Sequence, residues 1–122
     1  MKKHILILDD EASIRDLLAQ FLSSSGYQVT PVATASEALK IIRSECPDLV
    51  ISDLQLEDTD GLEMIDQLKK ESPDTPVILL TGVLFEPEVV EEVLSKHVDC
   101  YLEKTSSLTK IRKTVESLLA SS

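Results

Sequence analysis

The chain has 122 residues, of which 43% are hydrophobic and 28% charged. This is typical of one globular domain whose core needs neither disulfides nor a structural metal. A second folded domain does not fit in this length. Twenty-two acidic and twelve basic side chains give a formal net charge of −10, which repels both a nucleic-acid backbone and an anionic membrane. Direct nucleic-acid binding and membrane association are therefore not expected, and the apolar runs are too short to cross a bilayer.

The first predicted strand ends in a run of acidic residues. His4–Leu8 is a continuous apolar stretch, typical of a strand buried on both faces, and Asp9-Asp10-Glu11 follows directly. Apolar residues then recur at helical spacing from Ile14 to Leu22, and Gly26 stands where a left-handed helix terminus favours glycine. We therefore predict a first helix that stops near Ser25.

A second strand and helix lead to another strand that ends on a carboxylate. Residues Tyr27–Val32 are rich in β-branched and aromatic side chains, which favours a strand. Thr34, with Glu37 three positions later, resembles a capping box that opens the second helix. The apolar run Leu49–Ile51 continues through Ser52 to Asp53, so the third strand brings Asp53 to its carboxyl end.

The second half of the chain repeats this alternation. A third helix follows the acidic loop that ends at Gly61, and residues 77–80 predict a fourth strand with Thr81 at its end. Pro87 suits the first turn of a fourth helix. Residues 101–102 predict a short fifth strand with Lys104 just beyond it, and Ser106 or Ser107 can cap the last helix.

Strands that alternate with helices over the whole length imply βαβ units with right-handed crossovers, and hence a parallel sheet covered by helices on both faces. The predicted fold class is a three-layer, doubly wound α/β domain that spans residues 1–122. In such sheets the functional site lies outside the carboxyl ends of the strands. The polar residues at those ends are Asp9, Asp10, Asp53, Thr81 and Lys104.

These residue types together suit phosphoryl chemistry. Carboxylates brought together from two strands repel one another unless a cation intervenes, and hard oxygen ligands suit Mg²⁺. A carboxylate can attack phosphorus to give an acyl phosphate, while a lysine ammonium and a threonine hydroxyl stabilise charge on the phosphoryl oxygens. Taken singly, each residue has an ordinary structural explanation, such as a turn, a cap or a surface charge. Their joint placement favours a site.

The pattern of an acidic pair after strand one, Asp after strand three, Thr after strand four and Lys after strand five resembles the response-regulator receiver family over essentially the entire chain. The resemblance implies the CheY-like, flavodoxin-like (βα)5 fold with strand order 2-1-3-4-5. It also implies that Asp53 takes a phosphoryl group from the phosphohistidine of a sensor histidine kinase or a histidine phosphotransfer protein.

The same resemblance assigns roles around Asp53. It implies that Asp10 ligates Mg²⁺ together with Asp53 and the Gln55 carbonyl, and that Asp9 ligates the ion directly or through water. Lys104 and Thr81 would contact the phosphoryl group. Tyr101 would be the switch aromatic that turns inward as Thr81 moves, which changes the surface of helix four, strand five and helix five. The positions that tune acyl-phosphate hydrolysis would be Gln55 and Val83.

Several positions depart from the family pattern. Glu57 and Thr105 stand where the family usually has proline, and a cis bond before a non-proline residue such as Thr105 costs about 2.5–4 kcal/mol. Gly82 follows Thr81 where alanine is common, and His97-Val98 replaces a small pair. We expect these changes to affect switching more than chemistry.

Three other functions share part of this pattern. An aspartyl-phosphate hydrolase needs a second Asp two residues after the nucleophile, where this chain has Gln55. A flavodoxin-like cofactor binder needs a hydroxyl- and glycine-rich phosphate loop after strand one. A degenerate receiver would bind partners without phosphorylation. We expect no enzyme activity beyond self-phosphorylation and slow autodephosphorylation.

The remaining expectations concern location and assembly. Cys46 and Cys100 are compatible with one disulfide, but their wide spacing and the lack of a signal-peptide pattern favour two reduced, partly buried thiols in the cytoplasm. His4 and His97 are expected to have structural roles. We expect a monomer, or a homodimer formed on phosphorylation, that acts on a downstream effector either as a stand-alone domain or as part of a longer protein.

Overall fold

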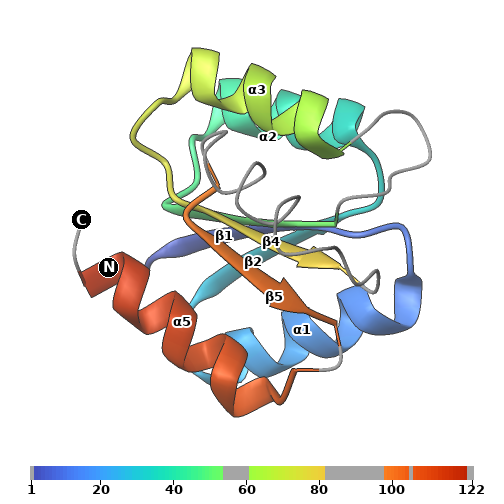
Figure 1. Cartoon of the computed structure of the whole chain (residues 1–122), viewed down its shortest axis with the longest axis vertical. Coiled ribbons are helices and arrows are strands. Elements are labelled where there is room, and N and C mark those ends of the chain that lie inside the picture. The colour runs from blue at the N-terminus through green and yellow to red at the C-terminus, as the bar shows by residue number, and fades with distance from the viewer. Residues whose placement is uncertain (1, 54–60, 82–97, 105, 121–122) are drawn as a thin grey trace, which may run out of the picture.

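Five parallel strands form a single sheet in the order β2-β1-β3-β4-β5, which confirms the order implied by the family resemblance (Figure 1). The computed structural model describes residues 2–53, 61–81, 98–104 and 106–120. The strands are β1 (His4–Leu8), β2 (Gln28–Val32), β3 (Leu49–Ser52), β4 (Val77–Thr81) and β5 (Cys100–Glu103). The helices are α1 (Ala12–Ser24), α2 (Ala35–Ser44), α3 (Gly61–Glu71) and α5 (Leu108–Ala120). The predicted helix near Pro87 lies outside the described residues.

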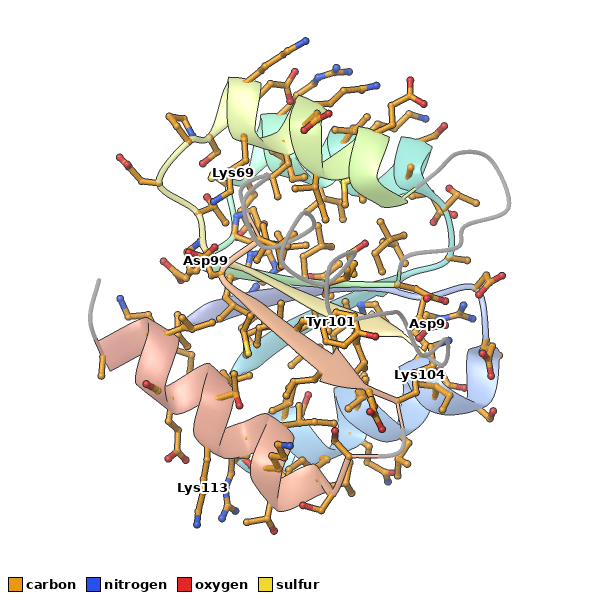
Figure 2. All side chains as sticks on the ribbon, viewed as in Figure 1. Asp9, Lys69, Asp99, Tyr101, Lys104 and Lys113 are labelled. Atoms are coloured by element: carbon orange, nitrogen blue, oxygen red, sulfur yellow. The ribbon has the colours of Figure 1, made fainter. Side chains whose placement is uncertain are left out.

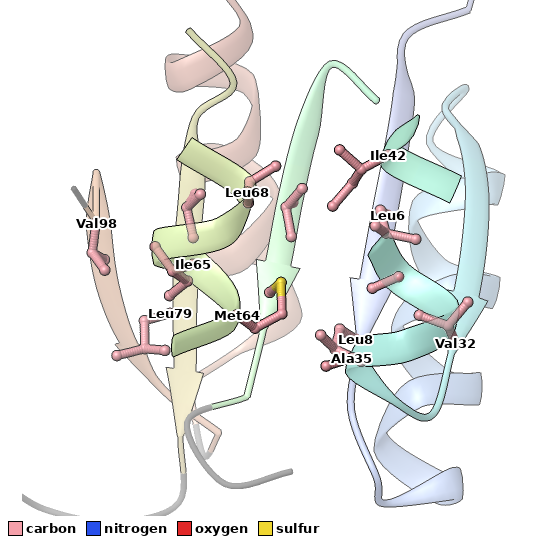
Figure 3. Packing of buried hydrophobic residues seen from close by; sticks show 13 residues of the cluster. Leu6, Leu8, Val32, Ala35, Ile42, Met64, Ile65, Leu68, Leu79 and Val98 are labelled. Atoms are coloured by element: carbon pink, nitrogen blue, oxygen red, sulfur yellow. The ribbon is translucent and has the colours of Figure 1, made fainter. Parts of the chain in front are cut away.

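The helices cover both faces of the sheet. In Figure 1, α2 and α3 lie on one side of the strands, and α1 and α5 lie on the other. Because successive side chains of a strand point to opposite faces, β1 supplies Leu6 and Leu8 to the first layer and Ile5 and Ile7 to the second. Figure 3 shows the first layer, where these β1 residues lie close to α2 and side chains of α3 pack over the neighbouring strands. Each fully buried aliphatic side chain contributes roughly 1.5–3 kcal/mol, so the two apolar layers stabilise this fold.

The local signals that end and begin the helices are confirmed with small corrections. Gly26 has a φ of 100°, the left-handed conformation that glycine adopts without strain. Thr34 accepts a hydrogen bond from the Glu37 N–H at 3.3 Å, but the Glu37 carboxylate accepts from the Thr34 hydroxyl instead of closing the predicted capping box on its backbone. Ser107 accepts from the Lys110 N–H at 3.1 Å, so Ser107, and not Ser106, caps α5.

The structure confirms the expectation for His4 and corrects part of the expectation for the cysteines. His4 is buried and its Nε2 lies 2.8 Å from the Thr30 hydroxyl, which agrees with a structural role. Cys46 and Cys100 are both free, as expected, but the expectation of partial burial is wrong for Cys46. The loop before β3 turns this thiol outward, where its Sγ lies 3.0 Å from the Ser72 hydroxyl. His97 lies outside the described residues.

A repeated hydrogen-bond pattern fixes the amino ends of the strands. Asp48, directly before β3, donates its N–H to the His4 carbonyl and accepts from the His4 N–H through Oδ2, both at 2.8 Å. Asp99, directly before β5, does the same for Val77, at 2.9 and 2.7 Å. Each aspartate therefore clamps the first residue of the neighbouring strand and fixes the register of that strand pair.

This clamp can be tested by stability. We expect Asp48→Ala to lower the free energy of unfolding by about 1 to 2 kcal/mol, because the buried His4 N–H loses a charged acceptor. Urea denaturation measures the change. Asp74→Ala, which removes an exposed carboxylate near the same end of the sheet, should change it by less than about 0.5 kcal/mol. Equal effects of the two substitutions would contradict the clamp.

Candidate functional site

The predicted acidic residues meet at the carboxyl edge of the sheet. Strands β1 and β3 are neighbours, and their last residues, Leu8 and Ser52, are register partners. Asp9 and Asp53 come one position later, so they leave adjacent strands side by side. The Asp53 N–H continues the ladder with a 2.9 Å hydrogen bond to the Leu8 carbonyl. Both aspartates are buried, although carboxylates are rarely buried unless they are paired.

Lys104 is the partner of both aspartates. Its Nζ lies 3.2 Å from Asp9 Oδ1, 2.9 Å from Asp53 Oδ2 and 2.7 Å from Glu11 Oε1. Figure 2 shows Asp9 and Lys104 at the same end of the sheet, with Lys69 and Asp99 at the other. An ammonium group has three N–H donors, so these three carboxylates use its full donor capacity. Within the described residues, the Lys104 ammonium is therefore held among three carboxylates.

In this cluster, burial and the neighbouring charges have opposite effects on the pKa of Lys104 and on that of Asp9. Burial disfavours the charged form of Lys104, but hydrogen bonds to Glu11 and Asp53 and the charges of Asp9 and Asp53 outweigh it and raise the lysine pKa. Burial also raises the pKa of Asp9, and the Glu11 N–H and Lys104 only partly offset that effect. The raised pKa of Lys104 favours a charged lysine, whereas the raised pKa of Asp9 favours a neutral carboxyl, although the two groups form one ion pair. The short Lys104 contacts support the charged pair, with Asp9 as its more strained member.

The carboxylates also form a potential cation site. Oxygen atoms of Asp9, Asp10, Glu11 and Asp53 all lie within 4.8 Å of one another, with Asp9 and Asp53 buried and the other two exposed. Several hard, anionic oxygens around one position are the donor set that Mg²⁺ prefers, with waters completing its coordination. The residues present therefore fit the predicted Mg²⁺ site. Gln55, the predicted carbonyl ligand, lies outside the described residues.

Glu11 was missed as a site residue at the sequence level. It makes the shortest of the three Lys104 contacts. The only signal was its place as the third residue of the acidic run, and an exposed glutamate before a helix is usually a solvated side chain. Arg15 was also missed. Its guanidinium donates to the Asp9 carbonyl at 2.8 Å and so supports the turn that presents Asp9.

The predicted switch residues are only partly visible. Thr81 is the last residue of β4 and is paired in register with Glu103, but its side chain lies outside the described part. Tyr101 pairs with Leu79, two residues before Thr81 along β4. The Tyr101 side chain is half-buried and packs against the apolar layer on the α3 side of the sheet (Figure 2). Val83, Glu57, Gly82 and Thr105 lie outside the described residues.

A doubly wound parallel sheet with an acidic cluster and a partly buried lysine at its carboxyl edge defines the receiver class of α/β domains. Comparison with known families agrees, since residues 5–116 match the family described as "Response regulator receiver domain". This chain therefore belongs to the response-regulator receiver family, whose members are signalling modules.

Individual relatives agree with this assignment. The chain is 36% identical over 121 residues to the alkaline phosphatase synthesis transcriptional regulatory protein PhoP of Bacillus subtilis, covering 98% of this chain and 49% of the relative. It is 38% identical over 120 residues to the probable transcriptional regulator ycf27 of Porphyridium aerugineum, covering 97% and 48%. The chain thus spans about half the length of the curated relatives it matches.

Solved structures extend the likeness to three dimensions. A CheY-like response regulator receiver domain protein from Methanospirillum hungatei superposes with a TM-score of 0.92 at 30% identity, covering 99% of this chain and 96% of that one. The receiver domain of NtrX from Brucella abortus gives 0.89 at 32% identity, covering 97% and 99%. None of the helices in the described ranges has the length and apolar character needed to span a bilayer.

The raised pKa of Asp9 gives a test of strain in the cluster. A carboxyl with a raised folded-state pKa binds its proton more tightly in the folded state, so its ionised form lowers stability at neutral pH. We expect Asp9→Asn, measured with a metal chelator at pH 7, to raise the melting temperature by a few degrees. The gain should shrink as the pH falls toward 3.8, the ordinary aspartate value.

Asp16→Asn is the matched control, because Asp16 is an exposed carboxylate on α1. Thermal unfolding followed by circular dichroism measures both variants. A fall in the melting temperature of Asp9→Asn at pH 7 would show that Asp9 stabilises the metal-free protein as a charge, contrary to this expectation.

Proposed function

We propose that this domain is a signalling switch in which Asp53 accepts a phosphoryl group in a Mg²⁺-dependent reaction. The observation that carries the proposal is the 2.9 Å contact between Lys104 Nζ and Asp53 Oδ2, made beside the carboxylates of Asp9 and Asp10. A structural ion pair needs one partner for the lysine. Here a nucleophile candidate, a charge-stabilising cation and a cluster of hard oxygen ligands meet at one edge of the sheet.

The chemistry follows from these groups. A carboxylate oxygen of Asp53 attacks phosphorus of a phosphohistidine, the P–N bond breaks, and its electron pair returns to the imidazole ring. Negative charge on the equatorial phosphoryl oxygens is stabilised by the Lys104 ammonium, which already lies at Asp53. Mg²⁺, when bound by Asp9, Asp10, Asp53 and the Gln55 carbonyl, supplies further positive charge and orients the phosphoryl group.

The proposed consequence is a change of surface. Phosphorylation adds about −1.5 to −2 charges at a buried rim, which biases a two-state element through new hydrogen bonds. Thr81 would bond the phosphoryl group and Tyr101 would turn inward, altering the face around β5 and α5. Gln55 and Val83 would set the rate of acyl-phosphate hydrolysis. The domain would catalyse only its own phosphorylation and slow autodephosphorylation.

The proposed partners follow from this chemistry. The donor would be a sensor histidine kinase or a histidine phosphotransfer protein in the cytoplasm. Residues 1–122 would form a single receiver domain, either stand-alone with a separate effector or as part of a longer protein. Two relatives are named as transcriptional regulators. With a net charge of −10, this domain would not itself contact DNA. We expect a monomer, or a homodimer after phosphorylation.

Treatment with acetyl phosphate and Mg²⁺ tests the central step. We expect intact-protein mass spectrometry to show one base-labile phosphoryl adduct on the wild-type chain and none on Asp53→Asn, because only a carboxylate can form the acyl phosphate. A wild-type chain without an adduct would instead support a receiver that binds partners independently of phosphorylation. An equal adduct on Asp53→Asn would place the acceptor elsewhere.

A second experiment separates metal binding from switching. We expect Asp10→Asn to weaken Mg²⁺ binding by roughly tenfold, since one anionic ligand is lost. Thr81→Ala should leave Mg²⁺ affinity within about twofold of wild type but impair the response to phosphorylation, because the proposed role of its hydroxyl is to bond the phosphoryl group and not the ion. Isothermal titration calorimetry measures the affinities. Unchanged affinity in Asp10→Asn would remove Asp10 from the ligand set.

A further inference from the structure

We propose that Glu11 is a positioning residue for Lys104, the partner that keeps the lysine ammonium at the rim when a divalent cation occupies the carboxylates of Asp9 and Asp53. This inference rests on the proposed Mg²⁺-dependent function. It concerns a residue outside the five-residue pattern that identified the site.

The contact itself is the first support. Glu11 Oε1 lies 2.7 Å from Lys104 Nζ, which is shorter than the distances to Asp53 Oδ2 and Asp9 Oδ1. The two residues are 93 positions apart in the chain and come from the end of β1 and the end of β5. The pair therefore links the two parts of the rim directly.

The geometry of Glu11 shows that its side chain is committed to this contact. Glu11 occupies the N-cap position of α1, where a side chain normally accepts from the N–H groups of the first helical turn. The Glu11 side chain makes no such bond. Its backbone N–H instead donates to Asp9 Oδ1 at 2.8 Å, and its carboxylate reaches Lys104. Glu11 is therefore fixed on the site at both its backbone and its side chain.

Burial makes this pair stronger than an ordinary surface ion pair. Exposed pairs contribute little because both long side chains must be ordered in water. The Lys104 side chain is already held, with 9% of its surface exposed, whereas Glu11 is 56% exposed. Formation of the pair therefore costs mainly the conformational freedom of the Glu11 side chain.

The proposed role of Glu11 follows from competition between a bound dication and the Lys104 ammonium for Asp9 and Asp53. A dication bound to Asp9 and Asp53 takes the oxygens that Lys104 now contacts and repels the ammonium. Of the three described carboxylates on Lys104, only Glu11 lies outside the proposed Mg²⁺ ligand set. If Glu11 retains one N–H of the ammonium, two donors stay available for phosphoryl oxygens at Asp53. Without Glu11, the displaced ammonium is left unpaired beside like charge.

Mg²⁺ affinity in a double-mutant cycle tests this role. The four proteins are wild type, Glu11→Gln, Lys104→Met and the double variant, titrated with MgCl₂ by calorimetry. In the presence of Lys104 we expect Glu11→Gln to weaken binding about tenfold, because both a nearby charge and the partner of the displaced ammonium are lost. In the Lys104→Met background only the charge effect remains, and we expect a change of about twofold to threefold.

Asp16→Asn serves as the matched control, since it removes one exposed carboxylate from the same helix and should change affinity by less than about twofold. Glu11→Asp keeps the charge and should restore part of the affinity. An equal loss from Glu11→Gln in both lysine backgrounds would overturn the proposal, because Glu11 would then act as a metal ligand or a simple charge.

Nitrogen-15 NMR of the lysine ammonium gives a readout independent of affinity. With Mg²⁺ in excess, we expect the Lys104 ammonium signal to persist in wild type and to broaden through solvent exchange in Glu11→Gln. Persistence of the signal in both proteins would contradict a positioning role. Neither measurement uses a phosphodonor, so a failure of Asp53 phosphorylation would leave this test decisive in its own right.

Discussion

The contact of Lys104 with Asp9 and Asp53 is the interaction on which the site depends. Two buried carboxylates on neighbouring strands repel each other, and burial weakens the screening that water would supply. The Lys104 ammonium offsets this repulsion. Lys104 follows β5, which lies next to β4, and its side chain reaches Asp53 at the end of β3. A metal cation that binds Asp9 and Asp53 must therefore compete with the Lys104 ammonium for the same carboxylate oxygens.

The parallel topology explains how residues so far apart in sequence reach one edge. Each strand enters the sheet in the same direction, so the residue that follows it always emerges at the carboxyl edge. The register of β1 with β3 then sets Asp9 against Asp53, and β5 contributes Lys104 from the far side of β4. The buried strand interiors are mainly aliphatic and supply packing. The residues of the acidic cluster and Lys104 lie in the few positions immediately after the strands.

Most of the fold and the central site residues could be predicted from the sequence because both follow from periodicity. Apolar runs that end in Asp9, Asp53 and Thr81 mark strand ends without any knowledge of tertiary structure. Glu11 could not be predicted in this way, since its role comes from a side-chain contact across 93 positions and not from its local pattern. The outward turn of Cys46 and the partial capping box at Thr34 likewise depend on loop geometry and rotamers, which periodicity does not encode.

The aspartate clamps at the amino edge have a mechanical consequence for the opposite edge. Asp99 ties the start of β5 to Val77, and Lys69 of α3 adds a 3.5 Å ion pair to the same carboxylate. With their amino ends held together, β4 and β5 stay paired in parallel register from Ile78 and Cys100 to Thr81 and Glu103. The clamp at the amino edge therefore also secures the strand register that sets Thr81 beside Glu103 at the carboxyl edge, where the acidic cluster lies.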